Sequence, residues 1–456
     1  MTARPSQPRT GTTTRDETPA PGGSGPGWRL STRDPDFEAR FASLLGAKRE
    51  ASEDVDRAAA AIIANVRARG DAALLEYSAR FDRIDLAKTG IRIAGHEINA
   101  ARAACDPAHL AALEFAATRI RAFHTRQKPQ DQLFEDALGV KLGWRWSAIA
   151  AVGLYVPGGS ASYPSSVLMN AIPAKVAGVD RVVMVVPTPD GEVSPLVLAA
   201  AALAGVDEIY RVGGAQAIAA LAYGTQTIRQ VSKIVGPGNA YVAAAKRLVF
   251  GQVGIDMIAG PSEVVIIADG SANPAWIAAD LLAQAEHDAA AQSILITDDA
   301  SLAEAVIAAL AGQLTLLPRR AIAEASWREN GAILLVADMA EAIGLANRLA
   351  AEHLEIMTRE PEAIAAEVRE AGAIFLGGHT PEAIGDYVGG SNHVLPTARS
   401  ARFASGLGVP DFMKRTSILQ CGPEQLAALG PAAIALGEAE GLDAHARSVA
   451  IRLNRR

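Results

Sequence analysis

The sequence predicts an α/β protein with two parallel sheets, a helical N-terminal region and a small, mainly helical C-terminal appendage. From about residue 148, short apolar runs alternate with amphipathic helical runs. Such alternation is typical of parallel strands joined by helices that cover the sheet. Before that point, residues 36–135 are rich in Ala and repeat long side chains at helical spacing, which predicts helices.

The N-terminal tail precedes these elements. Residues 1–27 are rich in Thr, Pro and Gly and show no periodic apolar pattern, so we expect them to be disordered. Residues 36–135 then supply the helical region.

The first predicted sheet occupies about residues 150–262. Its expected strands are the runs "AIAAVGLYV", "RVVMVVP" and "EIYRVG". Its expected helices are "SSVLMNAIPAKVAGV" and "SPLVLAAAALAGV".

The second predicted sheet is built mainly from residues 263–380. Its expected strands are "EVVIIAD", "SILIT", "AILLVA" and "AIFLG", and its expected helices cover roughly 274–290 and 338–350. Residues from about 405 to 456 predict the helical appendage.

Composition and charge argue against several classes of function. The net charge of −7 and the lack of a Lys/Arg cluster argue against nucleic-acid binding. The longest apolar runs are too short to span a bilayer, and no signal peptide is recognisable, so we expect a cytoplasmic protein without a membrane partner. Cys105 and Cys421 cannot form a disulfide framework or a zinc knuckle.

The stretch "AAEHLEIMT" places Glu352, His353 and Glu355 in an apolar neighbourhood. Burying such groups is costly unless they are paired, bound to a metal or used in proton transfer. The residues alone leave these three alternatives open.

Five further segments combine polar side chains with turns, loops or helices. For the Gly-rich loop of 153–171 and the loop of Asp386, Asn392 and His393, an ordinary turn or surface loop is as plausible as a binding site. For the Gly-Pro turns at 236–239 and 260–262, the Gln284/His287 pair and the Glu440/His445 pair, an ordinary structural role is favoured when each is taken alone.

Seven segments together resemble the histidinol dehydrogenase family, in the family's order, from about residue 36 to the end. They are "YVPGGSASYPSSVLMNAIPAKVAGV", "VGPGNAYVAAAKR", "IDMIAGPSEVVIIAD", "LLAQAEHD", "AAEHLEI", "GDYVGGSNHVLPT" and "EGLDAHARSVAIRL". The resemblance implies NAD-linked, zinc-dependent oxidation of L-histidinol to L-histidine through L-histidinaldehyde. It also implies two incomplete Rossmann-like domains and a homodimer.

The implied domains are a tail over 1–27, a first Rossmann-like domain over 28–154 plus 263–407 with the N-terminal helices, a second, NAD-binding domain over 155–262, and a C-terminal dimerisation tail over 408–456. The C-terminal segment would reach the partner's site, so that His393, Glu440 and His445 are candidates to act in trans.

The resemblance also implies roles for single residues. Glu352 and His353 would be the acid–base pair, with His353 as general base and Glu352 activating water. The zinc ligands would be Gln284, His287, Asp386 and His445. The NAD contacts would be Tyr155, Gln216 and Asn239. The substrate contacts would be Ser262, Gln284, His287, Glu352, His353, Asp386, His393, Glu440 and His445.

Chemistry is consistent with these roles. Two imidazoles, a carboxylate and an amide oxygen suit zinc, although manganese or cobalt would also be accepted. A neutral His is well matched to taking a hydroxyl proton. Since adjacent residues of a regular element point in different directions, we expect irregular backbone or a loop at Glu352 and His353.

Two rivals remain. A related NAD-dependent dehydrogenase of a small sulfonated diol would share the metal and acid–base residues but differ at histidinol contacts, whereas His393 and Glu440 are both present. A zinc-stabilised structural protein would have a closed metal site and no need for a neighbouring Glu-His pair.

Overall fold

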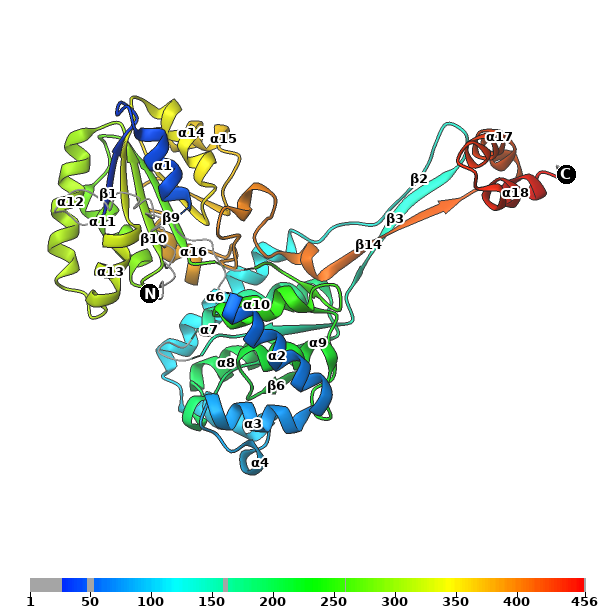
Figure 1. Ribbon diagram of the computed structural model, residues 1–456, viewed down its shortest axis with the longest axis horizontal. Helices are drawn as coiled ribbons and strands as arrows, with labels where there is room; N and C mark the ends of the chain where they lie inside the picture. Colours follow the sequence, from blue (N-terminus) through cyan, green and yellow to red (C-terminus); the bar gives the residue numbers. More distant parts are fainter. Residues whose placement is uncertain (1–26, 47–52, 159–162, 259, 455–456) are drawn as a thin grey trace, which may run out of the picture.

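The computed structural model describes residues 27–46, 53–158, 163–258 and 260–454. The expected disordered tail therefore lies outside the described residues, apart from Gly27. Two α/β lobes and a projecting arm make up the molecule (Figure 1). The predicted fold class, with two parallel sheets, is confirmed.

The five-stranded parallel sheet has the order β6-β5-β4-β7-β8. Its strands are β4 (Ala151–Tyr155), β5 (Arg181–Val185), β6 (Glu208–Tyr210), β7 (Lys233–Val235) and β8 (Gly254–Ile255). The connecting helices are α7 (Pro164–Ala177), α8 (Pro195–Ala204), α9 (Gly214–Tyr223) and α10 (Ala240–Val249). Strands β5 and β6 are added on one side of β4, and β7 and β8 on the other. The order of strands across the sheet therefore reverses between β4 and β7.

The six-stranded parallel sheet has the order β1-β11-β10-β9-β12-β13. Its strands are β1 (Trp28–Ser31), β9 (Glu263–Ala268), β10 (Gln292–Thr297), β11 (Ala332–Leu335), β12 (His353–Met357) and β13 (Ala373–Leu376). The helices of this lobe are α1 (Phe37–Gly46), α11 (Pro274–Ala285), α12 (Ala300–Leu314), α13 (Arg320–Asn330), α14 (Met339–Leu349) and α15 (Pro361–Glu367).

Helices cover both faces of the six-stranded sheet, which is why its central strands are apolar along their whole length. Every residue of β9 is buried. Val265 and Ile267 pack into the core cluster on one face, whereas Val264 and Ile266 belong to the cluster on the other.

The N-terminal helices join the five-stranded lobe, in contrast to the expected grouping of residues 28–154 with 263–407. These helices are α2 (Glu53–Arg69), α3 (Asp71–Phe81), α4 (Leu86–Thr89), α5 (Gly95–Ala104) and α6 (Pro107–Thr125). Helix α2 contacts α9 and α10, α5 contacts α8, and α6 contacts α7. The cause is the apolar stripe of α2, where Ile62 and Val66 share a core cluster with Ile218.

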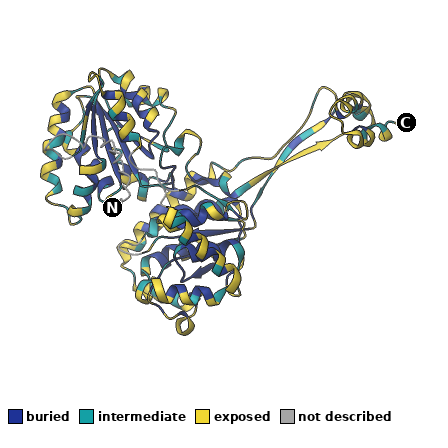
Figure 2. Ribbon diagram, viewed as in Figure 1, coloured by how far each residue is buried: buried dark blue, intermediate teal, exposed yellow. Residues whose placement is uncertain are grey.

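An antiparallel arm that was not predicted from the sequence projects from the two lobes. Its strands are β2 (Gln132–Glu135), β3 (Lys141–Ala148) and β14 (Met413–Gln420), in the order β14-β3-β2. Helices α17 (Pro423–Ala439) and α18 (Asp443–Arg452) lie at its tip. Figure 2 shows the arm largely exposed, whereas the strands of the two sheets are buried. Without a buried face, these strands lack the apolar pattern that identifies a strand in sequence.

Among the described residues, no helix combines the length and apolar character needed to cross a membrane.

Candidate active site

The predicted acid–base residues lie at the amino end of strand β12 in the six-stranded sheet. Glu352 is in a bend, and His353 is the first residue of the strand, paired with Val264 of β9 and Ala373 of β13. The expectation of irregular backbone is therefore wrong for His353. The bend before β12 packs closely against Gly372. A Cβ on Gly372 would lie 2.5 Å from the Glu352 carbonyl oxygen.

The imidazole of His353 is held with one nitrogen anchored and the other without a hydrogen bond. Nδ1 lies 3.1 Å from the Glu263 carbonyl oxygen. Because a carbonyl only accepts, Nδ1 carries the proton and Nε2 keeps its lone pair. Nε2 has no hydrogen-bond partner and lies 3.7 Å from a carboxylate oxygen of Asp386. Burial lowers the pKa of His353, so the ring is neutral and able to accept a proton.

Glu352 is buried beside this ring, with 5% of its surface exposed. Its carboxyl accepts a hydrogen bond from the Glu263 amide at 3.0 Å and another from Ser262. Burial raises the pKa of Glu352 well above its usual range, and these donors offset only part of the effect. The carboxyl lies 3.8 Å from His353 Nδ1. Because both pKa shifts favour the neutral forms, this contact is not an ion pair.

A group able to hold a metal lies next to His353. His287, Glu382 and Asp386 place one potential ligand atom each within 4.8 Å of one another. Glu382 and Asp386 are four apart on the short helix α16 (Glu382–Tyr387), which puts them on the same face. Glu382 is not among the residues predicted from the sequence, although its spacing from Asp386 could have identified it.

Gln284 and His287 come from the end of helix α11. The helix stops at Ala285, earlier than the expected range of 274–290, and His287 lies in the turn that follows. Gln284 is fully buried, and neither its amide oxygen nor its amide nitrogen has a hydrogen-bond partner. Burying an unsatisfied amide is costly, so a ligand for its oxygen would relieve that cost.

His393 joins the site from the same chain. Its Nδ1 lies 3.0 Å from the Asp386 carbonyl oxygen, and its Nε2 lies 3.3 Å from the Ser166 hydroxyl in helix α7 of the other lobe. By the same tautomer argument, Nδ1 donates and Nε2 accepts. Because His393 contacts Asp386 of its own chain, it needs no partner subunit to reach the site.

Glu440 and His445 are not brought to this site within one chain. Both are exposed, Glu440 at the end of α17 and His445 in α18. These helices lie at the tip of the arm, far from α16 and β12 (Figure 1). Within this chain they contribute nothing to the metal-capable group.

The expected cofactor contacts gather at the carboxyl end of the five-stranded sheet. Tyr155 ends β4, and its hydroxyl accepts a hydrogen bond from the Gly214 amide at 3.1 Å. Burial raises the pKa of Tyr155 to about 12. Gln216 is 2% exposed and its amide oxygen has no partner. Asn239 caps α10 by accepting from the Tyr241 and Val242 amides.

Glycine is required where this edge is most crowded. Gly236 has φ 107°. A Cβ on Gly236 would lie 2.2 Å from the Tyr155 carbonyl oxygen. The backbone after β7 therefore packs directly on the end of β4, next to the amino end of α10. Close backbone and a helix N-terminus are the features that receive phosphate groups of nucleotides.

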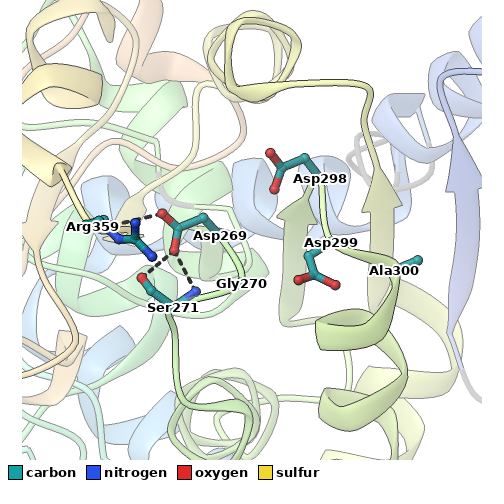
Figure 3. A pocket seen from close by; sticks show the side chains of 7 residues that line it. All are labelled: Asp269, Gly270, Ser271, Asp298, Asp299, Ala300 and Arg359. Carbon is teal, nitrogen blue, oxygen red and sulfur yellow. Dashed lines mark hydrogen bonds between the residues drawn. The ribbon is translucent and has the colours of Figure 1, made fainter.

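A separate depression of about 490 Å³ lies at the carboxyl end of the six-stranded sheet. Figure 3 shows its acidic lining. Asp269 already accepts from Ser271 and from the Arg359 amide, and Asp299 caps α12. None of the predicted site residues lines it, and Asp269 and Asp299 serve local structure, so the depression is separate from the candidate active site.

Comparisons with known proteins agree in pointing to one family. Residues 46–453 match the family model described as "Histidinol dehydrogenase". The chain is 71% identical to the histidinol dehydrogenase of Rhodopseudomonas palustris over 428 residues, which cover 94% of this chain and 99% of that protein. It is 68% identical to that of Brucella suis over 425 residues, covering 93% and 99%. A crystal structure of histidinol dehydrogenase from Elizabethkingia anophelis superposes with a TM-score of 0.89 at 36% identity, covering 94% of this chain and 98% of that chain.

Proposed function

Because the chain belongs to the histidinol dehydrogenase family, we propose that it oxidises L-histidinol to L-histidine through L-histidinaldehyde, reducing two NAD⁺ in turn at one site. The single observation that carries the proposal is the state of His353. Its Nδ1 is fixed on the Glu263 carbonyl, and its unpartnered Nε2 faces Asp386 beside a metal-capable group. A structural metal site would not need such a base next to it.

Zinc would be held by Gln284, His287, Asp386 and His445 of the partner subunit. The unsatisfied buried amide of Gln284 and the closeness of His287 to Asp386 fit such a mixed nitrogen and oxygen set. When bound, zinc would hold the substrate's imidazole and amine and so orient its hydroxyl. Glu382 lies in the same group and adds negative charge that favours a cation there.

The alcohol step needs a base for the hydroxyl proton while hydride leaves for NAD⁺. His353 Nε2 takes that proton, since Nδ1 is already protonated and anchored. The aldehyde step needs water. A cation at the neighbouring metal-capable group would favour the ionised form of Glu352, and this carboxylate deprotonates the water molecule that adds to the aldehyde. His353 returns the proton from the alcohol step to the aldehyde oxygen as water adds, and its neutral ring then takes a proton of the hydrate as the second hydride leaves for NAD⁺.

No cysteine thiol is needed for this route. Cys105 hydrogen-bonds the Ala101 carbonyl in the N-terminal helical region, and Cys421 is exposed near the arm tip. The proposal therefore adds water to the aldehyde and forms no covalent thiohemiacetal.

Substrate and cofactor approach from the two lobes. The substrate contacts would be Ser262, Gln284, His287, Glu352, His353, Asp386 and His393, with Glu440 and His445 of the partner subunit. NAD would contact Tyr155, Gln216 and Asn239. The close approach of Gly236 to β4 and the amino end of α10 support a dinucleotide at this edge.

The arm supports a homodimer. It exposes large apolar side chains, among them Leu133 at 64%, Leu419 at 67% and Leu436 at 64%. Apolar surface of this kind, on an element that covers nothing in its own chain, indicates a protein partner. A second copy of the chain would bury it and would receive Glu440 and His445.

A heterodimer of two inactive variants tests this function. Co-expressed His445→Ala and His353→Asn chains with different affinity tags are purified as the heterodimer. One of its two sites then combines an intact His353 with an intact His445 from the other subunit. We expect histidinol-dependent NAD reduction at about half the parent rate per dimer.

Each homodimeric variant should be nearly inactive. A heterodimer of the parent chain and His379→Ala controls for effects of the two tags, because His379 is exposed on the loop before α16. A heterodimer as inactive as the two homodimers would contradict transfer of His445 to the partner's site.

A further inference from the structure

The loop that follows α16 starts in the six-stranded lobe but is anchored on the five-stranded lobe. It carries Asn392 and His393. We propose that a buried hydrogen-bond network of Gln127, His124 and Asn392 fixes this loop across the two lobes and thereby positions His393 for the substrate. The inference rests on the proposed oxidation of histidinol and adds to it two positioning residues, His124 and Asn392.

Backbone groups fix the direction of each hydrogen bond at the first end of the network. Gln127 Oε1 accepts from the Val409 amide at 3.1 Å, so this atom is the oxygen of the side-chain amide. His124 Nδ1 lies 2.7 Å from the same oxygen and therefore carries the ring proton. Burial lowers the pKa of His124, so the ring is neutral and its Nε2 is an acceptor.

Asn392 completes the network from the loop. Its Oδ1 accepts from the Val394 amide at 2.9 Å, which identifies the other atom of the side-chain amide as the nitrogen. That nitrogen donates to the Met169 carbonyl of α7 at 2.7 Å and to His124 Nε2 of α6 at 3.4 Å. Both amide hydrogens and the amide oxygen of Asn392 therefore have partners.

Burial makes the position of the loop specific. His124 is fully buried and Asn392 is 7% exposed. A buried polar group that loses its partner is costly, because no water replaces the lost hydrogen bond. A shift of the loop would separate Asn392 from α6 and α7 at once, so the network favours the one loop position in which all its groups are satisfied.

The network acts on His393 because Asn392 and His393 bind neighbouring turns of the same helix. His393 Nε2 lies 3.3 Å from the Ser166 hydroxyl, and Asn392 is bonded to the Met169 carbonyl. Ser166 and Met169 are both buried in α7, three residues apart, so they lie on one face of the helix. Fixing Asn392 on α7 therefore fixes the ring of His393 between α7 and the Asp386 carbonyl.

A second anchor holds the earlier part of the loop from the surface. Arg119 of α6 donates to the Val388 carbonyl at 2.6 Å and to the Gly389 carbonyl at 3.0 Å. Gly390 has φ 105°, and a Cβ on it would lie 3.1 Å from the Arg119 carbonyl oxygen. Because Arg119 is exposed, water competes for these bonds, and the buried network makes the larger contribution to the position of His393.

Substitution of the central ring tests the network. His124→Leu fills a similar volume but neither donates nor accepts. We expect it to raise the KM for histidinol about tenfold and to leave kcat within about threefold, because a misplaced substrate contact weakens ground-state and transition-state binding alike. Asn392→Ala interrupts the network from the loop side and should give the same split. His124→Gln keeps a donor and an acceptor and should restore the KM to within about threefold of the parent value.

A double variant tests whether the effect passes through His393. His393→Asn can still donate to the Asp386 carbonyl but lacks the ring nitrogen that faces Ser166. Adding His124→Leu to His393→Asn should raise the KM for histidinol by less than about twofold more, since residues that act as a unit are not additive. Full multiplication of the two single effects would overturn the proposal.

Hydrogen exchange of the full-length protein supplies a measurement that needs no turnover. His124→Leu should speed exchange of the loop amides, that of Val394 among them, at least about tenfold and leave β12 unchanged. Ser326→Ala is the control for lost stability, because it removes a buried hydrogen bond to the Ala291 carbonyl in the six-stranded lobe. Its loop exchange and KM should equal those of the parent.

Parent-like loop exchange and KM in both His124→Leu and Asn392→Ala would overturn the network, and histidinol oxidation by the parent protein would then stand without it. Conversely, faster loop exchange in His124→Leu, in a protein whose parent oxidises no histidinol, would support the network and remove the proposed substrate.

Discussion

His353→Asn is expected to slow histidinol-dependent NAD reduction by about 10³-fold, within the range for loss of a general base. The variant should keep its fold and zinc content. An Asn amide can still donate to the Glu263 carbonyl that anchors Nδ1 at 3.1 Å, so the start of β12 keeps its polar contact. What is lost is the neutral ring nitrogen that faces Asp386.

The measurement is steady-state NADH formation at saturating histidinol, with circular dichroism for the fold and mass spectrometry for the metal. His96→Asn is the control, because His96 is exposed on α5 in the other lobe. A His353→Asn variant that turns over at the rate of the control would remove His353 from the mechanism.

Glu352→Gln is expected to slow the aldehyde step by about 10²-fold or more, and the alcohol step by less than about tenfold. Glutamine retains an oxygen to accept from the Glu263 amide, so the bend before β12 is preserved. It cannot take a proton from water. The wild-type carboxyl, once ionised, can take that proton.

The two steps are separated by supplying L-histidinol or L-histidinaldehyde and following NADH in each case. Glu355→Gln provides the comparison. Glu355 is 1% exposed, and its carboxyl accepts from the Glu382 amide at 2.7 Å, so we expect equal effects on both steps. Equal losses in Glu352→Gln would contradict its assignment to water activation.

The parallel sheets were predictable because burial on both faces makes their strands continuously apolar. The run "EVVIIAD" of β9 is an example, and the alternating helices follow from the same pattern. The arm was not predictable in this way. Seven of the eight residues of β14 are exposed, so no apolar period marks the strand. The position of the N-terminal helices depends on which lobe their apolar stripes meet, which is a tertiary property.

The site was predicted from motifs, and its geometry was not. The resemblance named His353, but only the fold reveals that it begins a strand and that the Glu263 carbonyl sets its tautomer. Glu382 was missed because a lone acid at a helix start is common, and its meaning depends on the approach of His287 from the turn after α11. The roles of Glu440 and His445 stay predictions, since one chain keeps them at the arm tip.

The measurement that tests the central claim most directly is the number of NADH formed per L-histidinol by the purified protein, before and after chelation and with zinc added back. We predict two NADH per histidinol, with activity lost on chelation and restored by zinc. A folded protein with bound zinc that forms no NADH from histidinol would contradict the account and favour a related dehydrogenase with another alcohol substrate.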